Sequence, residues 1–116
     1  MSFTLNTRKV GDVVIIDMSG RLAIGEAVLL LRNTSRRFIE DGSSKFVLNL
    51  GSVSHIDSAG LGELISIYTS VRNKQGDVKL LNLTAKARDL LQMTKLLTVF
   101  DTYDDETKAV AALKPK

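Results

Sequence analysis

Two stretches that lie close together in the sequence decide the fold: Phe46-Val47-Leu48-Asn49-Leu50 and Asp57-Ser58-Ala59-Gly60-Leu61-Gly62. The first is a nearly continuous apolar run, which is typical of a strand covered on both faces. After a short bridge over residues 51–56, the second leads into apolar residues at three- and four-residue steps, and this spacing predicts a helix over residues 58–74. Ser58 is therefore expected where the connection from a strand becomes a helix.

The position of Ser58 allows two interpretations. Unpaired backbone N–H groups and the helix dipole favour an oxygen or a negative charge at the start of a helix, so the hydroxyl can serve as a cap. A phosphate on the same hydroxyl would change the local charge by about −1.5 to −2 at neutral pH, so Ser58 can also serve as a switch. Gly60 and Gly62 would each cost a helix roughly 1 kcal/mol relative to alanine. We expect a further reason for them, such as the close approach of another backbone.

The rest of the sequence alternates between strand-like and helix-like patterns. Strands are predicted over residues 3–7, 13–18, 46–50, 78–83 and 97–100, and a turn at Gly11-Asp12 joins the first two as a hairpin. Helices are predicted over residues 26–41 and 58–74, then from a cap at Thr84, and last from a cap at Thr102 or Asp104; residues 20–25 are expected to form a loop. The predicted fold is α/β, in the order β-β-α-β-α-β-α-β-α. It is a mixed β-sheet with an N-terminal antiparallel hairpin, covered by helices mainly on one face or divided between two.

The composition indicates an ordinary globular protein with one domain over residues 1–116, because 44% of the residues are hydrophobic and 25% are charged. The chain has no cysteine, which excludes disulfides, thiolate catalysis and thiolate metal sites. No apolar run approaches the length of a membrane span, and the first residues lack the pattern of a signal peptide. From the sequence we expect a cytoplasmic protein without membrane insertion.

Charge and motifs argue against several classes of function. The net charge is +3, but the basic residues are scattered and no aromatic residues alternate with them, so no nucleic-acid partner is expected. His55, Asp57 and Ser58 are too close in the sequence to line up as a hydrolase triad. The acidic run over residues 101–106 lacks the spacing of a calcium loop, and no glycine-rich phosphate loop is present. We predict that the protein is not an enzyme and uses no cofactor or metal.

In this setting the chain resembles a STAS domain, the family of the bacterial anti-sigma factor antagonists. The resemblance extends from about residue 3 to residue 113 and rests on four segments: residues 47–50 with 56–62, Gly20-Arg21-Leu22, residues 78–82, and residues 90–97 with 99–100. The family signature, Asp-Ser-(small)-Gly-Leu-Gly, is matched by residues 57–62. The Gly-x-Leu loop of the family is usually followed by Asp or Asn, whereas Ala23 follows it in this chain.

The resemblance implies a regulator of transcription that is switched by phosphorylation. In the antagonists of this family, a kinase that is also the anti-sigma factor phosphorylates the serine after the signature Asp. The unphosphorylated antagonist binds that kinase, and phosphorylation releases it. The matched serine in this chain is Ser58. The residues expected to contact the partner are Leu22, Ile24, Asp57, Ser58, Ala59, Gly60 and Leu61.

Two questions stay open at this point. Leu22, Ile24 and Leu61 are expected to form an exposed apolar patch beside Ser58, although apolar character alone is equally consistent with the core. Ala23 favours a second function, a constitutive STAS docking module in a stress-signalling complex or a lipid-transport assembly, whereas the intact Asp57-Ser58 pair favours the phosphorylation switch more. Weak homodimerisation is also left open. No Lys or Arg lies within ten residues of Ser58, so we expect a phosphate there to break an interface rather than to dock a loop.

Overall fold

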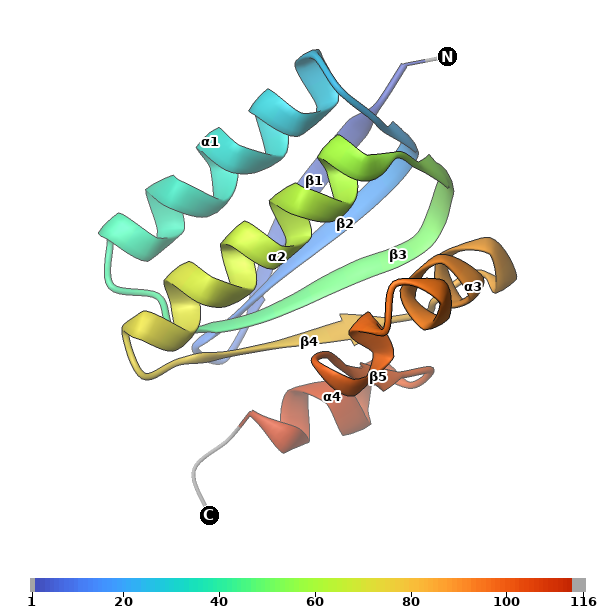
Figure 1. Cartoon of the computed structure of the whole chain (residues 1–116). Coiled ribbons are helices and arrows are strands. Elements are labelled where there is room, and N and C mark those ends of the chain that lie inside the picture. The colour runs from blue at the N-terminus through green and yellow to red at the C-terminus, as the bar shows by residue number, and fades with distance from the viewer. Residues whose placement is uncertain (1, 114–116) are drawn as a thin grey trace.

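The structure, a computed structural model, describes residues 2–113. Its centre is a five-stranded sheet in the order β1-β2-β3-β4-β5. The strands are β1 (Thr4–Val10), β2 (Val13–Leu22), β3 (Lys45–Ile56), β4 (Asp77–Leu81) and β5 (Asp101–Tyr103). β1 and β2 are antiparallel, and the later neighbours are parallel (Figure 1). The expected α/β fold, with a mixed sheet and an N-terminal antiparallel hairpin, is confirmed.

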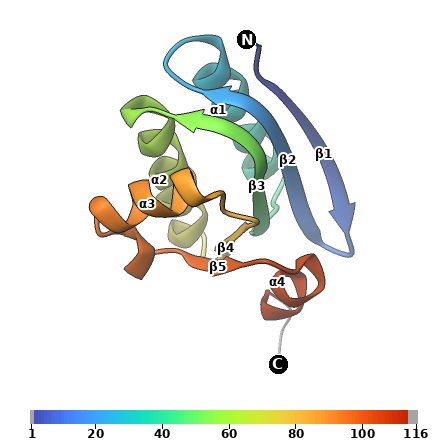
Figure 2. The ribbon, with the colours of Figure 1, turned by 90° about the vertical axis from the view of Figure 1, so that its right-hand side faces the viewer.

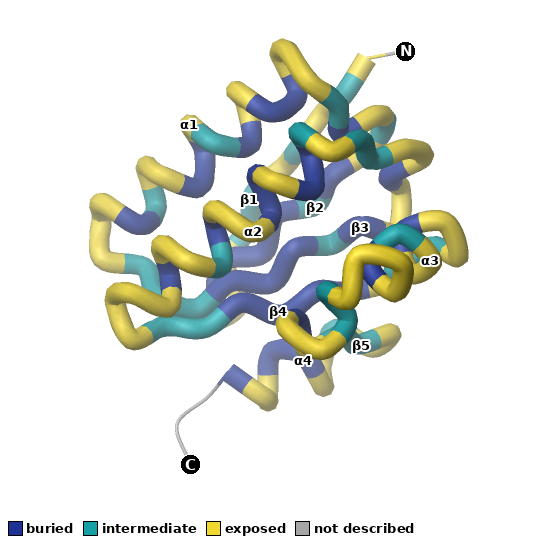
Figure 3. Tube along the Cα trace, viewed as in Figure 1, coloured by how far each residue is buried: buried dark blue, intermediate teal, exposed yellow. Residues whose placement is uncertain are grey.

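Helices cover both faces of this sheet. α1 (Glu26–Glu40), α2 (Ser58–Asn73) and α3 (Ala85–Met93) lie on one face, and α4 (Glu106–Ala112) lies on the other (Figure 2). Phe46 and Leu48 belong to the core cluster under the first three helices, whereas Val47 belongs to the smaller cluster under α4. Because neighbouring residues alternate between the two clusters, this part of β3 is covered on both faces, as its sequence predicts. The buried residues follow the central strands and the inner sides of the helices (Figure 3).

Two strands are longer than the sequence predicts. β3 continues through residues 51–56, where a bridge is expected, and β2 continues to Leu22, where a loop is expected. The two extensions pair with each other in parallel, with Gly20 opposite Val53 and Leu22 opposite Ile56. This pairing satisfies backbone groups, so the exposed polar side chains of this segment do not end the strand.

The last strand also lies elsewhere than predicted. Of the predicted strand over residues 97–100, the first two residues lie in a 3₁₀ helix (Leu96–Thr98), and the observed strand β5 begins only at Asp101. Phe100 is buried because its ring packs against Tyr68 of α2, with the ring centroids 5.1 Å apart. Phe100 is therefore apolar because it packs against a helix, and it does not belong to a strand of the sheet.

The helix caps agree with the sequence in one case and differ in another. Thr84 caps α3 as predicted, because its hydroxyl accepts a hydrogen bond from the N–H of Ala87 at 3.1 Å. Asp105 caps α4 by accepting a hydrogen bond from Lys108, so the predicted caps, Thr102 and Asp104, are wrong. Several neighbouring residues in this segment are good caps, and the pattern alone could not choose among them.

Arg8 of β1 connects α4 to the sheet. Its guanidinium donates to Asp17 of β2, with Nε and Oδ2 2.7 Å apart, and to Glu106 of α4, with Nη1 and Oε2 3.0 Å apart. Asn49 of β3 also donates to Asp17 at 2.8 Å. The hydrogen bonds from Arg8 hold the pKa of Asp17 and the pKa of Glu106 below their usual ranges. One charged group thus joins two strands and a helix on the face opposite α1 and α2.

We predict that Arg8→Met destabilises the protein at neutral pH and that the difference from the parent shrinks in acid. Both carboxyls have lowered pKa values in the folded state. Their stabilising contribution is therefore complete above the usual values of 3.8 and 4.5, and it is lost as the pH falls below them. Urea unfolding at pH 7, 5 and 3 measures the difference, with Lys9→Met as the control for losing an exposed cation from the same strand. A difference that stays constant from pH 7 to pH 3 contradicts this prediction.

Candidate functional site

Asp57 organises the start of α2 and is the N-cap of this helix. One of its carboxylate oxygens accepts a hydrogen bond from the N–H of Gly60, and the other accepts one from the N–H of Ile24, both at 2.9 Å. The hydrogen bonds from Ile24 and Gly60 lower the pKa of Asp57 below its usual range. Asp57 therefore joins the loop before α1 to the first turn of α2. The interpretation of Ser58 as the cap is corrected, because Asp57 fills that role.

Ser58 is the first residue of α2 and is exposed. Within residues 2–113 its hydroxyl has no hydrogen-bond partner. The start of α2 lies beyond the end of β3 and near the point where β2 leads into α1 (Figure 1). The hydroxyl is thus open to solvent on a first turn that is already capped.

The two glycines of the signature have different surroundings. A Cβ atom on Gly60 would lie 2.2 Å from the carbonyl oxygen of Leu22, so only glycine allows α2 to approach the end of β2 this closely. The expected close approach of another backbone is confirmed at this position. A Cβ atom on Gly62 would meet nothing within 4 Å, and Gly62 is exposed. Packing therefore explains Gly60 and does not explain Gly62.

The apolar residues predicted beside Ser58 divide into core and surface. Leu22 is fully buried and Leu61 is 8% exposed, and both belong to the core cluster under α1, α2 and α3. The expectation that these two side chains form an exposed patch is wrong, because the end of β2 packs directly against the first turn of α2. Ile24 is 81% exposed and lies on the surface as expected. Ala59 is half-buried.

Ile24 shares this surface with two leucines of α1. Leu29 and Leu30 are 52% and 42% exposed, and we refer to Ile24, Leu29 and Leu30 as the α1 patch. A hollow of about 450 Å³ between α1 and α2 is lined by Ile24 and Leu29 on one side and by Ala59 and Gly62 on the other. The α1 patch therefore reaches the first turn of α2, where Ser58 lies.

Comparison with known proteins places the chain in a family. The STAS domain family model matches residues 4–109. The chain belongs to the STAS domain family. A Thermotoga maritima protein named "Putative anti-sigma factor antagonist" is 30% identical over 107 residues, which are 92% of this chain and 95% of that protein.

Two solved structures extend the comparison. A crystal structure of a Thermotoga maritima protein of the same description has a TM-score of 0.89 at 28% identity, and the match covers 96% of this chain and 95% of that chain. The Bacillus cell fate determinant SpoIIAA in its phosphorylated form has a TM-score of 0.75 at 23% identity, and the match covers 97% of this chain and all of that chain. The second likeness shows that the two proteins share the fold.

Ala23 lines a second hollow, of about 590 Å³, beside the loop before α1. The other lining residues include the apolar Ile24 and Leu30 and the charged Arg21 and Glu26. The loop before α1 is held to Asp57 through the backbone N–H of Ile24, so no polar side chain at position 23 is needed for that contact.

Sequence reasoning missed Leu29 and Leu30 as surface residues. They lie in the apolar run Val28-Leu29-Leu30-Leu31 of α1. Four consecutive residues extend around more than one turn of a helix, so they cannot all face the core. Val28 and Leu31 are buried, and the two residues between them are exposed. The run itself was the signal that could have revealed the α1 patch.

Of the two acidic residues near Ser58 in the sequence, Asp57 and Glu63, one is buried and paired with an arginine. Glu63 is buried, with 3% of its side chain exposed, and its Oε1 accepts a hydrogen bond from Nε of Arg32 of α1 at 2.9 Å. Its charge is therefore paired, and the carboxylate that remains beside Ser58 is that of Asp57.

Over residues 2–113, no group of His, Asp or Glu side chains is arranged to hold a metal ion, and no helix is long and apolar enough to cross a membrane.

We predict that Asp57→Ala lowers the thermal midpoint by several degrees, because the start of α2 loses its cap and the loop before α1 loses its anchor. Ser58→Ala, at the neighbouring exposed position, should change the midpoint by no more than about 2 °C. Thermal unfolding followed by circular dichroism measures both variants. If Ser58→Ala is the more damaging substitution, Asp57 is not the group that holds this turn.

Proposed function

We propose that this STAS domain is an anti-sigma factor antagonist, a regulator without enzymatic activity that binds a kinase-type anti-sigma factor. Binding occurs while Ser58 is unphosphorylated, and phosphorylation of Ser58 releases the partner. The observation that carries the proposal is the exposed hydroxyl of Ser58 on the family's signature turn, which has no hydrogen-bond partner among the described residues and lies at a helix start that Asp57 caps. The name of the Thermotoga maritima relative and the phosphorylated state of the Bacillus structure support this reading.

The charges around Ser58 support release rather than capture on phosphorylation. A phosphate on the first residue of α2 would gain only about 0.3–1 kcal/mol from the helix dipole. It would stand beside Asp57, whose lowered pKa keeps the carboxylate charged at neutral pH. Arg32 is already engaged with Glu63. A partner surface that packs against a neutral hydroxyl would therefore meet new charge and a new desolvation cost.

The α1 patch supplies the apolar part of the proposed interface. Ile24, Leu29 and Leu30 are all substantially exposed. Ile24 and Leu29 line the hollow between α1 and α2 that reaches the turn bearing Ser58, and Leu30 lines the neighbouring hollow together with Ile24. Exposed apolar groups that lie together usually mark an interaction site. Gly62, which lies in the same hollow, leaves space that a partner side chain can fill.

Ala23 supports a second candidate function, a constitutive docking module. The residue that usually follows Gly-x-Leu in the family is polar, and here an alanine lines the hollow beside Ile24 and Leu30. A module of this kind would use the same α1 patch but would bind its partner irrespective of the state of Ser58. The next two experiments separate the two functions.

We predict that a kinase-type anti-sigma factor from the same genome, with ATP, adds one phosphate to Ser58 and none to Ser66 or Ser70. These two serines are exposed on the same helix and serve as internal controls. Mass spectrometry locates the phosphate. Ser58→Asp should bind this partner at least tenfold more weakly than Ser58→Ala, with similar thermal midpoints. Phosphate only on Ser66 or Ser70 would overturn the switch, and equal binding by both Ser58 variants would favour the docking module.

We predict that Ile24→Ser weakens partner binding about tenfold, which corresponds to roughly 1.4 kcal/mol, because an exposed apolar anchor is lost. Met93→Ser is the matched control. Met93 is 80% exposed against 81% for Ile24, but it lies on α3 rather than beside α1. Calorimetric titration measures both variants. Equal losses in the two variants, or a loss only in Met93→Ser, would place the interface away from the α1 patch.

A further inference from the structure

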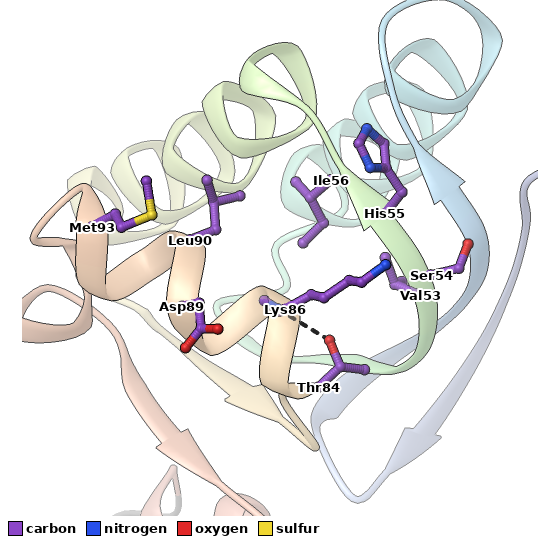
Figure 4. A pocket seen from close by; sticks show the side chains of 10 residues that line it. Val53, Ser54, His55, Ile56, Thr84, Lys86, Asp89, Leu90 and Met93 are labelled. Atoms are coloured by element: carbon purple, nitrogen blue, oxygen red, sulfur yellow. Dashed lines mark hydrogen bonds between the residues drawn. The ribbon is translucent and has the colours of Figure 1, made fainter.

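A cavity of about 280 Å³ lies between the end of β3 and α3 (Figure 4). It exists because β3 extends beyond β4: the pairing of these strands stops at Asn49 opposite Leu81, while β3 continues to Ile56. The extension has β2 on one edge, and on the other edge α3 lies beside it without pairing as a strand. The cavity is therefore a consequence of the strand extension and is not part of the α1 patch.

One end of this cavity is apolar. Ile56 of β3 and Leu90 of α3 point toward each other across it, and Met93 continues the same wall (Figure 4). Met93 is 80% exposed, so this apolar surface is open at its far end. An alkyl chain placed there would cover side chains that are otherwise in contact with water.

The other end carries the ammonium of Lys86. Lys86 extends from the first turn of α3 across the cavity toward Ser54 of β3 (Figure 4). In the part of the chain that the structure describes, its ammonium has no ion pair or hydrogen bond. The methylene stem of Lys86 adds to the apolar wall, while its charge stays near the opening. An anionic group bound beside Ser54 would therefore meet one positive charge.

The first turn of α3 is already capped. The hydroxyl of Thr84 accepts a hydrogen bond from the N–H of Ala87 at 3.1 Å, drawn as the dashed line in Figure 4, so this N–H is not free to bind an anion. Asp89 also lines the cavity and carries a negative charge. Asp89 offsets the charge of Lys86 for any anion that lies between them. A negative group therefore gains from these charges only where the ammonium of Lys86 points toward Ser54, and there it meets one positive charge (Figure 4).

We propose that this cavity binds a small amphipathic monocarboxylate. The carboxylate accepts hydrogen bonds from the ammonium of Lys86, and the alkyl chain lies against Ile56, Leu90 and Met93. Ligand pockets are usually roughly 300–1,000 Å³, so a cavity of about 280 Å³ suits a molecule of about ten non-hydrogen atoms, the size of octanoate. The proposal does not depend on the proposed function, because neither Ser58 nor the α1 patch lines the cavity.

The test is a titration of the isotope-labelled full chain with octanoate, followed by backbone amide NMR signals. We expect saturable shifts centred on residues 53–56 and on α3. Lys86→Met should raise the dissociation constant at least fivefold. Arg88→Met is the matched control, since Arg88 lies on the same helix but lines a different hollow, and it should bind octanoate like the parent.

Three further probes test the two halves of the ligand separately. Acetate lacks the alkyl chain, 1-octanol lacks the charge, and inorganic phosphate carries more charge and no chain; each should bind at least fivefold more weakly than octanoate. Absence of saturable shifts with octanoate, equal binding by parent and Lys86→Met, or a comparison ligand that binds as tightly as octanoate would each overturn the proposal. Lys86 is exposed, so its replacement leaves the core untouched and the variant remains informative.

Discussion

The carboxylate of Asp57 is the group on which the rest of this surface depends. It accepts one N–H from the loop that leads into α1 and one from the first turn of α2, each at 2.9 Å. Gly60 completes the arrangement, because only a residue without Cβ lets α2 approach the carbonyl of Leu22. Together these contacts bring the starts of two helices to the end of β2. Leu22 is buried as a result, and Ser58 is left outside.

This arrangement separates the stability of the turn from the chemistry of its serine. Because Asp57 supplies the cap, a change at Ser58 removes no hydrogen bond from residues 2–113. A charge added to Ser58 would meet the carboxylate of Asp57 within the domain, but it would replace none of the hydrogen bonds that hold the start of α2. If Ser58 were the cap, modification would alter the start of α2 and the contact surface together. Because Asp57 caps the helix and Ser58 carries the exposed hydroxyl, a phosphate on Ser58 could repel a partner without unfolding the start of α2.

The sequence predicted those parts of the fold that depend on local patterns. The spacing of Leu61 and Leu64 predicted α2, and the apolar run from Phe46 predicted a strand with two covered faces. Prediction failed where the partner is distant. Residues 20–22 and 51–56 form strands only because they pair with each other, and Phe100 is buried by Tyr68, which is far away in the sequence. Choosing Asp57 over Ser58 as the cap required knowing that α2 begins against Leu22.

The extension of β3 explains why the domain has two different surfaces at this end. On one edge, the extension pairs with β2, and the turn after Ile56 meets the loop that carries Ile24. On the other edge, pairing with β4 stops at Asn49, and α3 leaves a cavity beside the strand. His55 and Ile56 line that cavity and directly precede Asp57. The same segment of β3 therefore forms a wall of the cavity on one side and leads directly into the turn of Asp57 and Ser58 on the other.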